Sequence, residues 1–438
     1  MKGLADEPNH ILELLGGGTT LEDVIDGHVQ EQALVEKSVF VVADLGVLLR
    51  QHVMWQQTAS QLTAYYPVKS NCSPAVIQVL ASLGLGFVCA NKGEISLVLD
   101  HGVPPENIIF SGVCKQLSHI KYAAKNGVDL LVCDNETELC KIARSHPSAK
   151  LLVQVTTWAQ AAETSMAFGC SLKSCRRLLE AARALGVQVV GATFHIPASC
   201  KDLQAYSHAL SDARCVFDMG VELGYSMSIL DIGGGFSGSD YQLKQVMSAV
   251  QPLLEAYFPS MSGVQVIAEP GSYFVSSAFT LAVNVIGKKV FGRDWSGLVQ
   301  GDLTPDDEPE FLYYLNDGVY GSFSSKLLGS TIPAPAVHKR ASPGVEPVFS
   351  SSLQGPSLDI LDHVVEHCLL PELLPGDWLV FHNMGAAGLD SPSTFTDASA
   401  PRPPVYYVVS TADWYEMQEA GVDLGDIMKT FSLVQYGA

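Results

Sequence analysis

The sequence has few charged residues, and few of these are basic. Of the 438 residues 16% are charged, where about a quarter is usual in soluble domains. The 26 Lys and Arg are outnumbered by 46 Asp and Glu, which gives a formal net charge of -20. Because such a surface repels phosphate groups and anionic lipid headgroups, we expect neither nucleic-acid binding nor membrane binding.

Long hydrophobic runs and a secretion signal are also missing. The most apolar window, residues 76–90, is interrupted by a glutamine, a serine and two glycines. It falls short of the ~18 continuous apolar residues of a membrane span. Asp6 and Glu7 stand where a signal peptide would need basic residues. We therefore expect a cytoplasmic protein, with the nucleus as a second candidate compartment.

The ten cysteines form no metal or disulfide pattern. They stand at positions 72, 89, 114, 133, 140, 170, 175, 200, 215 and 368. There is no CxxC pair, and no histidine spacing that would hold zinc. We expect reduced, mostly buried thiols and no metal site.

Short runs rich in β-branched residues alternate with amphipathic, helix-like segments between residues 62 and 270. The strand candidates are Leu62–Lys69, Gly86–Asn91, Asn107–Gly112, Leu130–Asn135, Lys150–Val155, Val189–Ile196, Ser228–Gly234 and Gln265–Glu269. The segments between them have the 3.6-residue period of helices packed on a sheet. Eight such units predict an α/β fold of the (β/α)8 TIM barrel type. A doubly wound sheet fits less well, since its Gly-rich dinucleotide fingerprint is absent after the first strand.

The pattern changes after Ser276 to strand-like runs with no predicted helix between them. These runs are Phe279–Val290, Phe311–Leu315, Trp378–Phe381 and Val405–Ser410. We therefore predict three parts: residues 1–40, which join a β domain; residues 41–276, which form the barrel; and residues 277–438, which form a C-terminal β domain of sandwich-like or barrel-like form.

Residues suited to chemistry stand at the ends of the predicted barrel strands, where barrel enzymes have their active sites. Lys69 ends the first strand, His195 the sixth and Glu269 the eighth, and glycines 233–235 follow the seventh. A desolvated lysine can form a Schiff base with pyridoxal phosphate, and glycine N–H groups can bind a phosphate. Singly, each feature also has an ordinary explanation as a solvent-reaching lysine, a tight turn or a member of an ion pair.

Together and in this order, these residues resemble the eukaryotic ornithine decarboxylase family. The matching segments are YYPVKSN, GVPPENIIF, CKQLSHIKYAAKNGV, SDARCVFDMG, LDIGGGF, AEPG, LNDGVYGSF, LPELLPGDW and NMGA. The resemblance implies a pyridoxal-phosphate barrel of the alanine-racemase-like type with a C-terminal β domain, and active sites formed between two subunits.

The resemblance also assigns roles to individual positions. Lys69, His195 and Glu269 match the family's Schiff-base lysine, ring-stacking histidine and pyridine-nitrogen carboxylate. Asp359 matches a substrate-side aspartate, and Gly234 and Gly235 belong to the glycine turn. We expect these residues to be vestiges of a cofactor site.

Several positions that the family needs for catalysis differ in this chain. Ser272 replaces the arginine that grips the cofactor phosphate, and Leu358 replaces the cysteine that reprotonates the carbanion. The other replacements are Val88, Gln154, Pro197, Ala198, Gly329 and Ala387. Since they affect different steps of one mechanism, we expect no catalytic residue and lost or very weak binding of pyridoxal phosphate. One alternative is an active decarboxylase with an altered substrate, and another is a cofactor-carrying barrel without a protein partner.

The resemblance also bears on assembly. Ala167 replaces a lysine that pairs with an aspartate of the second subunit in the decarboxylases, while Asp362 keeps the other half of that pair. An uncompensated charge at an interface commonly costs about 2–5 kcal/mol. We therefore expect a monomer or a weak homodimer.

One segment, Lys115–Leu139, matches the family's binding site for antizyme, a protein that captures decarboxylase monomers for degradation. On a helix that begins near Gln116, residues three and four apart lie on one face. The resemblance predicts antizyme contacts at Lys115, Gln116, Ser118, Lys121, Tyr122, Lys125, Asn126, Glu136 and Glu138. The alternative interpretation is an ordinary solvated helix of the barrel.

The motifs MKG, EPGSYF and SDARCVFDMG are most similar to those of the antizyme inhibitors, the non-catalytic members of the family that sequester antizyme. The resemblance implies a protein that binds antizyme, releases active ornithine decarboxylase, and so raises polyamine synthesis and uptake. Cys140 stands where such proteins tend to have a lysine.

Overall fold

The computed structural model describes residues 11–34, 37–159, 168–197, 200, 202–294, 297–299, 309–338, 347–357, 359–386, 402–424 and 430–432. The contacts within the chain divide it into two compact units. The barrel unit comprises Leu48–Phe274 and Ala420–Asp423. The β unit comprises the described residues up to Val47, those from Val275 to Glu419, and those from Leu424 onward.

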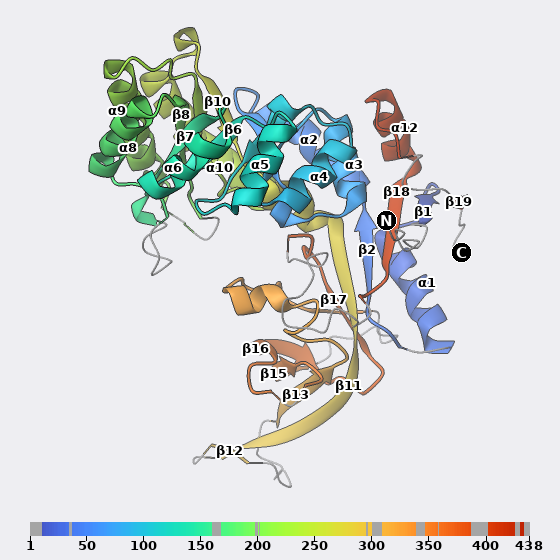
Figure 1. Cartoon of the computed structure of the whole chain (residues 1–438). Coiled ribbons are helices and arrows are strands. Elements are labelled where there is room, and N and C mark those ends of the chain that lie inside the picture. Colours follow the sequence, from blue (N-terminus) through green and yellow to red (C-terminus); the bar gives the residue numbers. More distant parts are fainter. Residues whose placement is uncertain are drawn as a thin grey trace. The chain divides into compact units, whose positions relative to one another are not determined.

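Eight described strands close a parallel barrel in the barrel unit (Figure 1). They are β3 (Thr63–Pro67), β4 (Gly86–Cys89), β5 (Ile108–Phe110), β6 (Leu130–Cys133), β7 (Lys150–Val155), β8 (Gln188–Phe194), β9 (Ile229–Asp231) and β10 (Gln265–Ala268). Neighbouring strands pair in chain order, and β10 pairs with β3 to close the ring. Each strand overlaps one of the predicted runs, so the predicted barrel is confirmed.

Helix α2 precedes the first barrel strand, the other long helices follow barrel strands, and all of them lie outside the barrel (Figure 1). The long ones are α2 (Gly46–Thr58), α3 (Pro74–Ser82), α4 (Lys92–Asp100), α5 (Leu117–Lys125), α6 (Glu136–Ser145), α8 (Leu172–Ala184), α9 (Gln204–Glu222) and α10 (Asp240–Tyr257). Polar caps define several of their beginnings. The side chains of Asn91 and Asn135 accept hydrogen bonds from the N–H groups of Glu94 and Glu138 at 3.0 and 2.8 Å, and such caps satisfy N–H groups without a partner inside the helix.

The barrel interior contains an apolar cluster built from several strands. Its buried members are Tyr65, Val88, Ile109, Val132, Leu152 and Ile267. Val88, which stands where the decarboxylases have an aspartate, is 4% exposed within this cluster. A carboxylate at this position would be buried among hydrocarbon groups, which is costly without a charged partner.

The β unit is a mixed sheet with the order β16-β15-β13-β11-β2-β18-β1-β19. Its long strands are β1 (Ile11–Leu15), β2 (Phe40–Asp44), β11 (Phe279–Asp294), β13 (Pro309–Leu315), β15 (Val348–Gln354), β16 (His363–Pro371) and β18 (Val405–Ser410). Shorter ones are β12 (Gly297–Val299), β14 (Ala336–Val337), β17 (Trp378–Phe381) and β19 (Thr430–Ser432). This unit and the barrel together confirm the predicted fold class.

The details of the β unit differ from the sequence-based prediction in two respects. Strand β2 lies beyond the boundary drawn at residue 40, yet it pairs with β11 and β18, because its apolar residues Phe40 and Val42 belong to the core of this unit. The unit also contains helices, α1 (Leu21–Leu34) and α12 (Thr411–Glu419), and α12 follows β18 directly. The polar sequence of α12 buries only Met417 among its residues, so it lacks an apolar period that would reveal it.

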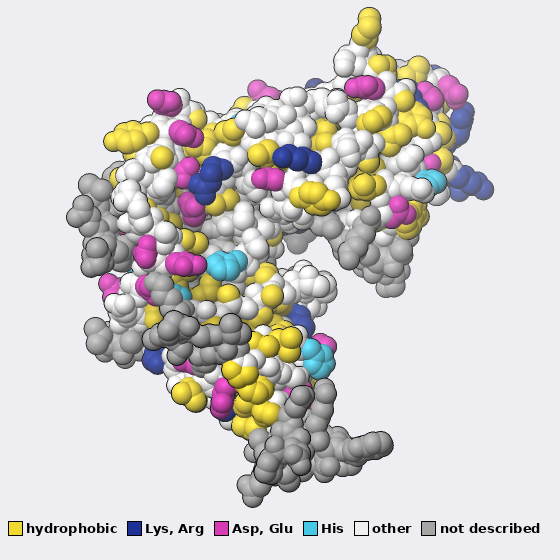
Figure 2. Space-filling view, turned by 180° about the vertical axis from the view of Figure 1, so that it is seen from behind, with side chains coloured by type: hydrophobic (Ala, Val, Ile, Leu, Met, Phe, Trp, Pro, Cys, Tyr) yellow, Lys and Arg dark blue, Asp and Glu magenta, His cyan; other side chains and the backbone are white. Residues whose placement is uncertain are grey.

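Charged side chains of both signs are dispersed among uncharged ones on the face shown in Figure 2. This agrees with the low charged fraction of the sequence. None of the described helices combines the length and the apolar composition that crossing a bilayer requires. Of the ten cysteines, Cys114 and Cys215 are exposed and the others are buried or partly buried.

Candidate functional site

The predicted cofactor residues of the barrel unit lie at the carboxyl ends of its strands. Lys69 is exposed on a short 3-10 turn, Val68–Ser70, that directly follows β3. His195 follows β8, and Glu269 follows β10. The charges of Glu269 and Lys69 act in opposite directions on the pKa of His195, which burial lowers. The structure therefore brings these three side chains to one site.

The glycine turn after β9 is already engaged by its own chain. The N–H of Gly233 donates to Oδ1 of Asp231 at 2.9 Å, and the N–H of Gly234 donates to Nδ1 of His195 at 3.2 Å. Gly233 has a φ of 65°, and a Cβ there would stand 2.2 Å from the carbonyl oxygen of Phe194. The turn thus requires glycine, but two of its N–H groups have acceptors other than a phosphate.

A pair of carboxyl groups occupies the ends of β9 and β10. Asp231 is fully buried, and burial, followed by the charge and hydrogen bond of Glu269, raises its pKa well above the usual range. Thr193 donates from its hydroxyl to Oδ2 of Asp231 at 3.1 Å. The carboxyl group of Asp231 therefore holds its proton more tightly than an exposed aspartate does, and Glu269 is its hydrogen-bond partner. Asp231 was not among the predicted site residues, although a carboxylate at the end of an apolar strand in LDIGGGF is a signal in the sequence.

The replaced positions bring no charge into this site where the structure describes them. Ser272 is half-buried in the short helix α11 (Gly271–Val275), Gln154 is half-buried on β7, and Val88 lies in the apolar cluster. Pro197 follows β8, and Gly329 belongs to the β unit, where it has a φ of 85°. The remaining positions, Ala167, Ala198, Leu358 and Ala387, lie outside the described residues.

These residues fit the two halves of pyridoxal phosphate unequally. Lys69, His195 and Glu269 are the residue types that would bind its aldehyde and ring, and they share one site. The phosphate is a dianion, and the neutral hydroxyl of Ser272 cannot bind it as the guanidinium of an arginine would. Within the described residues, no group of three or more His, Cys, Asp or Glu side chains is placed to hold a metal ion.

Two aspartates of the β unit have partners within that unit. Asp359 is exposed, and its pKa is lowered by hydrogen bonds from the N–H of Leu361 and the hydroxyl of Tyr320. Asp362 is buried, and its carboxylate accepts from the N–H groups of Val319 and Ser357 at 2.8 and 3.0 Å. Backbone donors therefore satisfy the Asp362 carboxylate within its own unit.

The predicted antizyme-binding helix is α5, and its exposure follows the predicted spacing. Gln116 precedes the first residue of α5, and Ser118, Lys121 and Lys125 are exposed along it, while Tyr122 is half-buried. Nζ of Lys92 on α4 lies 4.9 Å from the centre of the Tyr122 ring. The positive charge of Lys92 on α4 thus lies over the ring of Tyr122 on α5.

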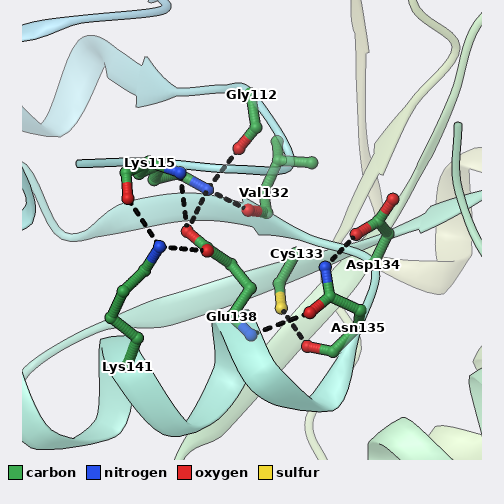
Figure 3. Close-up of polar contacts among 8 residues, drawn as sticks. All are labelled: Gly112, Lys115, Val132, Cys133, Asp134, Asn135, Glu138 and Lys141. Atoms are coloured by element: carbon green, nitrogen blue, oxygen red, sulfur yellow. Dashed lines mark hydrogen bonds and ion pairs between the residues drawn. The ribbon is translucent and has the colours of Figure 1, made fainter. Parts of the chain in front are cut away.

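The ends of the predicted segment are placed differently. Asn126 is half-buried, and its side chain donates to the carbonyl oxygen of Tyr122 at 2.8 Å, which closes the C-terminus of α5. Glu136 is exposed in the first turn of α6. Lys115 and Glu138, however, are 4% and 3% exposed. Their placement on the surface was wrong, because both side chains turn inward and bind each other (Figure 3).

The barrel has a lysine, a histidine and a carboxylate at its strand ends, and the β unit contains residues from both ends of the chain. This combination is typical of the pyridoxal-dependent decarboxylases. Residues 45–276 match the family described as pyridoxal-dependent decarboxylase, pyridoxal binding domain. The crystal structure of the arginine decarboxylase of Paramecium bursaria Chlorella virus superposes with a TM-score of 0.76 at 27% identity, and covers 88% of this chain and 100% of that one.

Two curated relatives narrow the family. Antizyme inhibitor 1 of Pongo abelii is 53% identical over 438 residues, which is 99% of this chain and 96% of that protein. Ornithine decarboxylase of Rattus norvegicus is 46% identical over 412 residues, which is 93% of this chain and 88% of that protein. The chain therefore belongs to the family of ornithine decarboxylases and antizyme inhibitors.

Proposed function

We propose that this chain is a catalytically inactive homologue of ornithine decarboxylase that binds and sequesters antizyme. By occupying antizyme it releases active ornithine decarboxylase, and so raises polyamine synthesis and uptake. The observation that carries the proposal is the exposed face of α5, on which Ser118, Lys121 and Lys125 are exposed as the family's antizyme-binding segment predicts. The 53% identity to antizyme inhibitor 1 over nearly the whole chain supports it.

Loss of catalysis and of the cofactor is part of this proposal. Ser272 leaves the phosphate of pyridoxal phosphate without its cationic ligand, and the N–H groups of Gly233 and Gly234 already have acceptors. The carboxyl group of Glu269 is engaged in a hydrogen bond with Asp231. A carboxylate so engaged is a poorer partner for a pyridine nitrogen, because the ring would have to displace Asp231.

The binding proposal is tested by calorimetry with purified antizyme, followed by a competition assay. In the competition, antizyme is first saturated with ornithine decarboxylase, whose activity it suppresses, and this chain is then added. We expect saturable binding and recovery of decarboxylase activity in proportion to the added chain. Bovine serum albumin at the same concentration is the matched protein control. No binding heat together with no recovered activity would refute the proposal.

The second candidate function is a pyridoxal-phosphate-dependent decarboxylase with an altered substrate. The observation that favours it is the shared placement of Lys69, His195 and Glu269 at one end of the barrel. Its test is the visible absorption band of a lysine–aldehyde adduct after incubation with pyridoxal phosphate. A band that disappears in Lys69→Ala, with release of carbon dioxide from an amino acid, would establish this candidate instead.

Assembly and location belong to the same proposal. The chain is a monomer or a weak homodimer, since Ala167 removes one partner of the family's interface pair, although Asp362 is satisfied within its own unit. A monomer exposes the antizyme-binding face without first dissociating. It acts in the cytoplasm and can also enter the nucleus, and it binds neither nucleic acid nor membranes. Sedimentation on dilution and imaging of the tagged chain test these points.

A further inference from the structure

A largely buried ionic cluster joins the loop before α5 to β6 and α6 (Figure 3). We call it the Lys115 cluster, and it consists of Lys115, Glu138 and Lys141. Nζ of Lys115 donates to the carbonyl oxygens of Gly112 and Val132, both at 2.5 Å. Its side chain therefore crosses from the loop before α5 to the strand β6.

Glu138 connects this loop to the helix α6. Its Oε1 accepts from the backbone N–H of Lys115 at 3.0 Å and lies 3.8 Å from Nζ of the same residue. Its Oε2 lies 2.6 Å from Nζ of Lys141, which also donates to the carbonyl oxygen of Lys115 at 2.5 Å. Both the N–H and the carbonyl group of Lys115 are thus held by side chains of α6.

An ordinary solvated helix does not need such a cluster. Removing charged groups from water is expensive, and a buried ion pair seldom adds net stability. Its best-attested benefit is to favour one geometry over alternatives, because misplaced charges would be left unpaired. Here the geometry is that of the loop before α5, since Lys115 stands two residues before Leu117, the first residue of α5.

The protonation of Lys115 depends on its burial and on the charged groups around it. Burial lowers its pKa to about 8, and Glu138 opposes that effect. The other groups that act on it are Cys133, Lys141 and Asp134. The ion pair is therefore sensitive to mildly alkaline conditions, unlike an exposed lysine.

We propose that the Lys115 cluster positions α5 against α6 and thereby sets the geometry of the antizyme-binding surface. Lys115 and Glu138 are positioning residues that do not touch the partner. The identity of the partner, antizyme, rests on the proposed function. The positioning of the two helices stands on the contacts of the cluster alone.

The test compares Lys115→Met and Glu138→Gln with the exposed change Lys121→Met. Lys244→Met, an exposed change on α10, is the matched control. We expect Lys115→Met and Glu138→Gln each to weaken antizyme binding about tenfold, and the double variant to lose much less than the product of the two losses, because coupled residues are not additive. The salt dependence of binding should stay as in the wild type for both buried variants. It should become shallower for Lys121→Met, which removes an exposed contact charge.

Hydrogen exchange of the α5 amides provides a readout without antizyme. We expect residues 117–125 to exchange faster in Lys115→Met and Glu138→Gln than in the wild type, and Lys244→Met to show no change. Glu138→Gln has nearly the shape of the original side chain, so it carries the test if Lys115→Met does not fold.

The outcomes separate the two proposals. If the wild type does not bind antizyme, the proposed function fails, and the exchange experiment still decides whether the cluster positions α5. If the wild type binds while both buried variants match it in affinity and exchange, the positioning role is overturned. A shallower salt dependence in Lys115→Met would also overturn it, since Lys115 would then be a contact residue.

Discussion

Nδ1 of His195 accepts a hydrogen bond from the backbone N–H of Gly234 at 3.2 Å. This nitrogen therefore carries no proton, which agrees with burial lowering the pKa of His195. The contact joins the end of β8 to the glycine turn after β9, and so uses an N–H group that could otherwise bind a phosphate. Ser272 replaces the family's arginine, and the Gly234 N–H is engaged by His195. Both differences thus affect the phosphate half of the cofactor site.

Restoring the missing cation tests this relationship. We expect Ser272→Arg to bind pyridoxal phosphate more tightly than the wild type, because a guanidinium matches the geometry of a phosphate. We expect no decarboxylation of ornithine, since the other replaced positions are not restored. Titration followed by absorbance and a carbon dioxide release assay measure the two effects, with Ser272→Ala as the control. Turnover in Ser272→Arg would contradict the view that catalysis was lost at several steps.

The carboxyl pair at the strand ends makes stability depend on pH. A buried acid with a raised folded-state pKa holds its proton more tightly when folded, so its contribution is complete below the unfolded-state pKa and is lost as pH rises through the folded-state pKa. For Asp231 the loss begins above the ordinary pKa of 3.8. Each tenfold difference in proton affinity between the folded and unfolded states contributes about 1.4 kcal/mol.

We therefore expect Asp231→Asn to become more stable relative to the wild type as pH rises from about 4 to about 8. The asparagine amide can still donate to Glu269 but does not titrate. Urea unfolding at a series of pH values measures the difference in unfolding free energy, and the exposed change Asp100→Asn is the control. A difference that is constant across the series would show that Asp231 is not protonated in the fold.

The sequence predicted the barrel well because each parallel strand is a short apolar run bounded by turns. It predicted Lys69, His195 and Glu269 together for the same reason, since all three follow such runs. It could not predict that Lys115 is buried, because Lys115 precedes the first turn of α5 and helical periodicity does not determine its direction. The burial of Glu138 on α6 depends on its contact with Lys115, which lies in the loop before α5. The hydrophobic period of a single helix cannot predict a contact between two elements.

The cation above the Tyr122 ring should stabilise the contact between α4 and α5. We expect Tyr122→Leu to lower the unfolding free energy by about 0.5–1 kcal/mol, the usual size of an exposed cation–π interaction. Tyr122→Phe keeps the ring and should behave as the wild type. Combining each change with Lys92→Met completes a double-mutant cycle, in which coupling should be present for leucine and absent for phenylalanine. Equal stability of all the variants would mean that the 4.9 Å approach of Lys92 contributes nothing.

The exposed lysines of α5 allow the most direct test of partner binding. Lys121 and Lys125 lie on one exposed face, four residues apart and therefore adjacent on the helix. We expect Lys121→Glu and Lys125→Glu each to weaken antizyme binding by about 1 kcal/mol or more, because contact charges at interfaces can carry that much. The melting temperature should barely change, as exposed substitutions usually alter stability by less than about 0.5 kcal/mol. Lys173→Glu on α8, another exposed helix position, makes the same change of charge elsewhere and should leave antizyme binding intact. If the double variant Lys121→Glu/Lys125→Glu binds antizyme as tightly as the wild type in calorimetry, the contact face is not on α5.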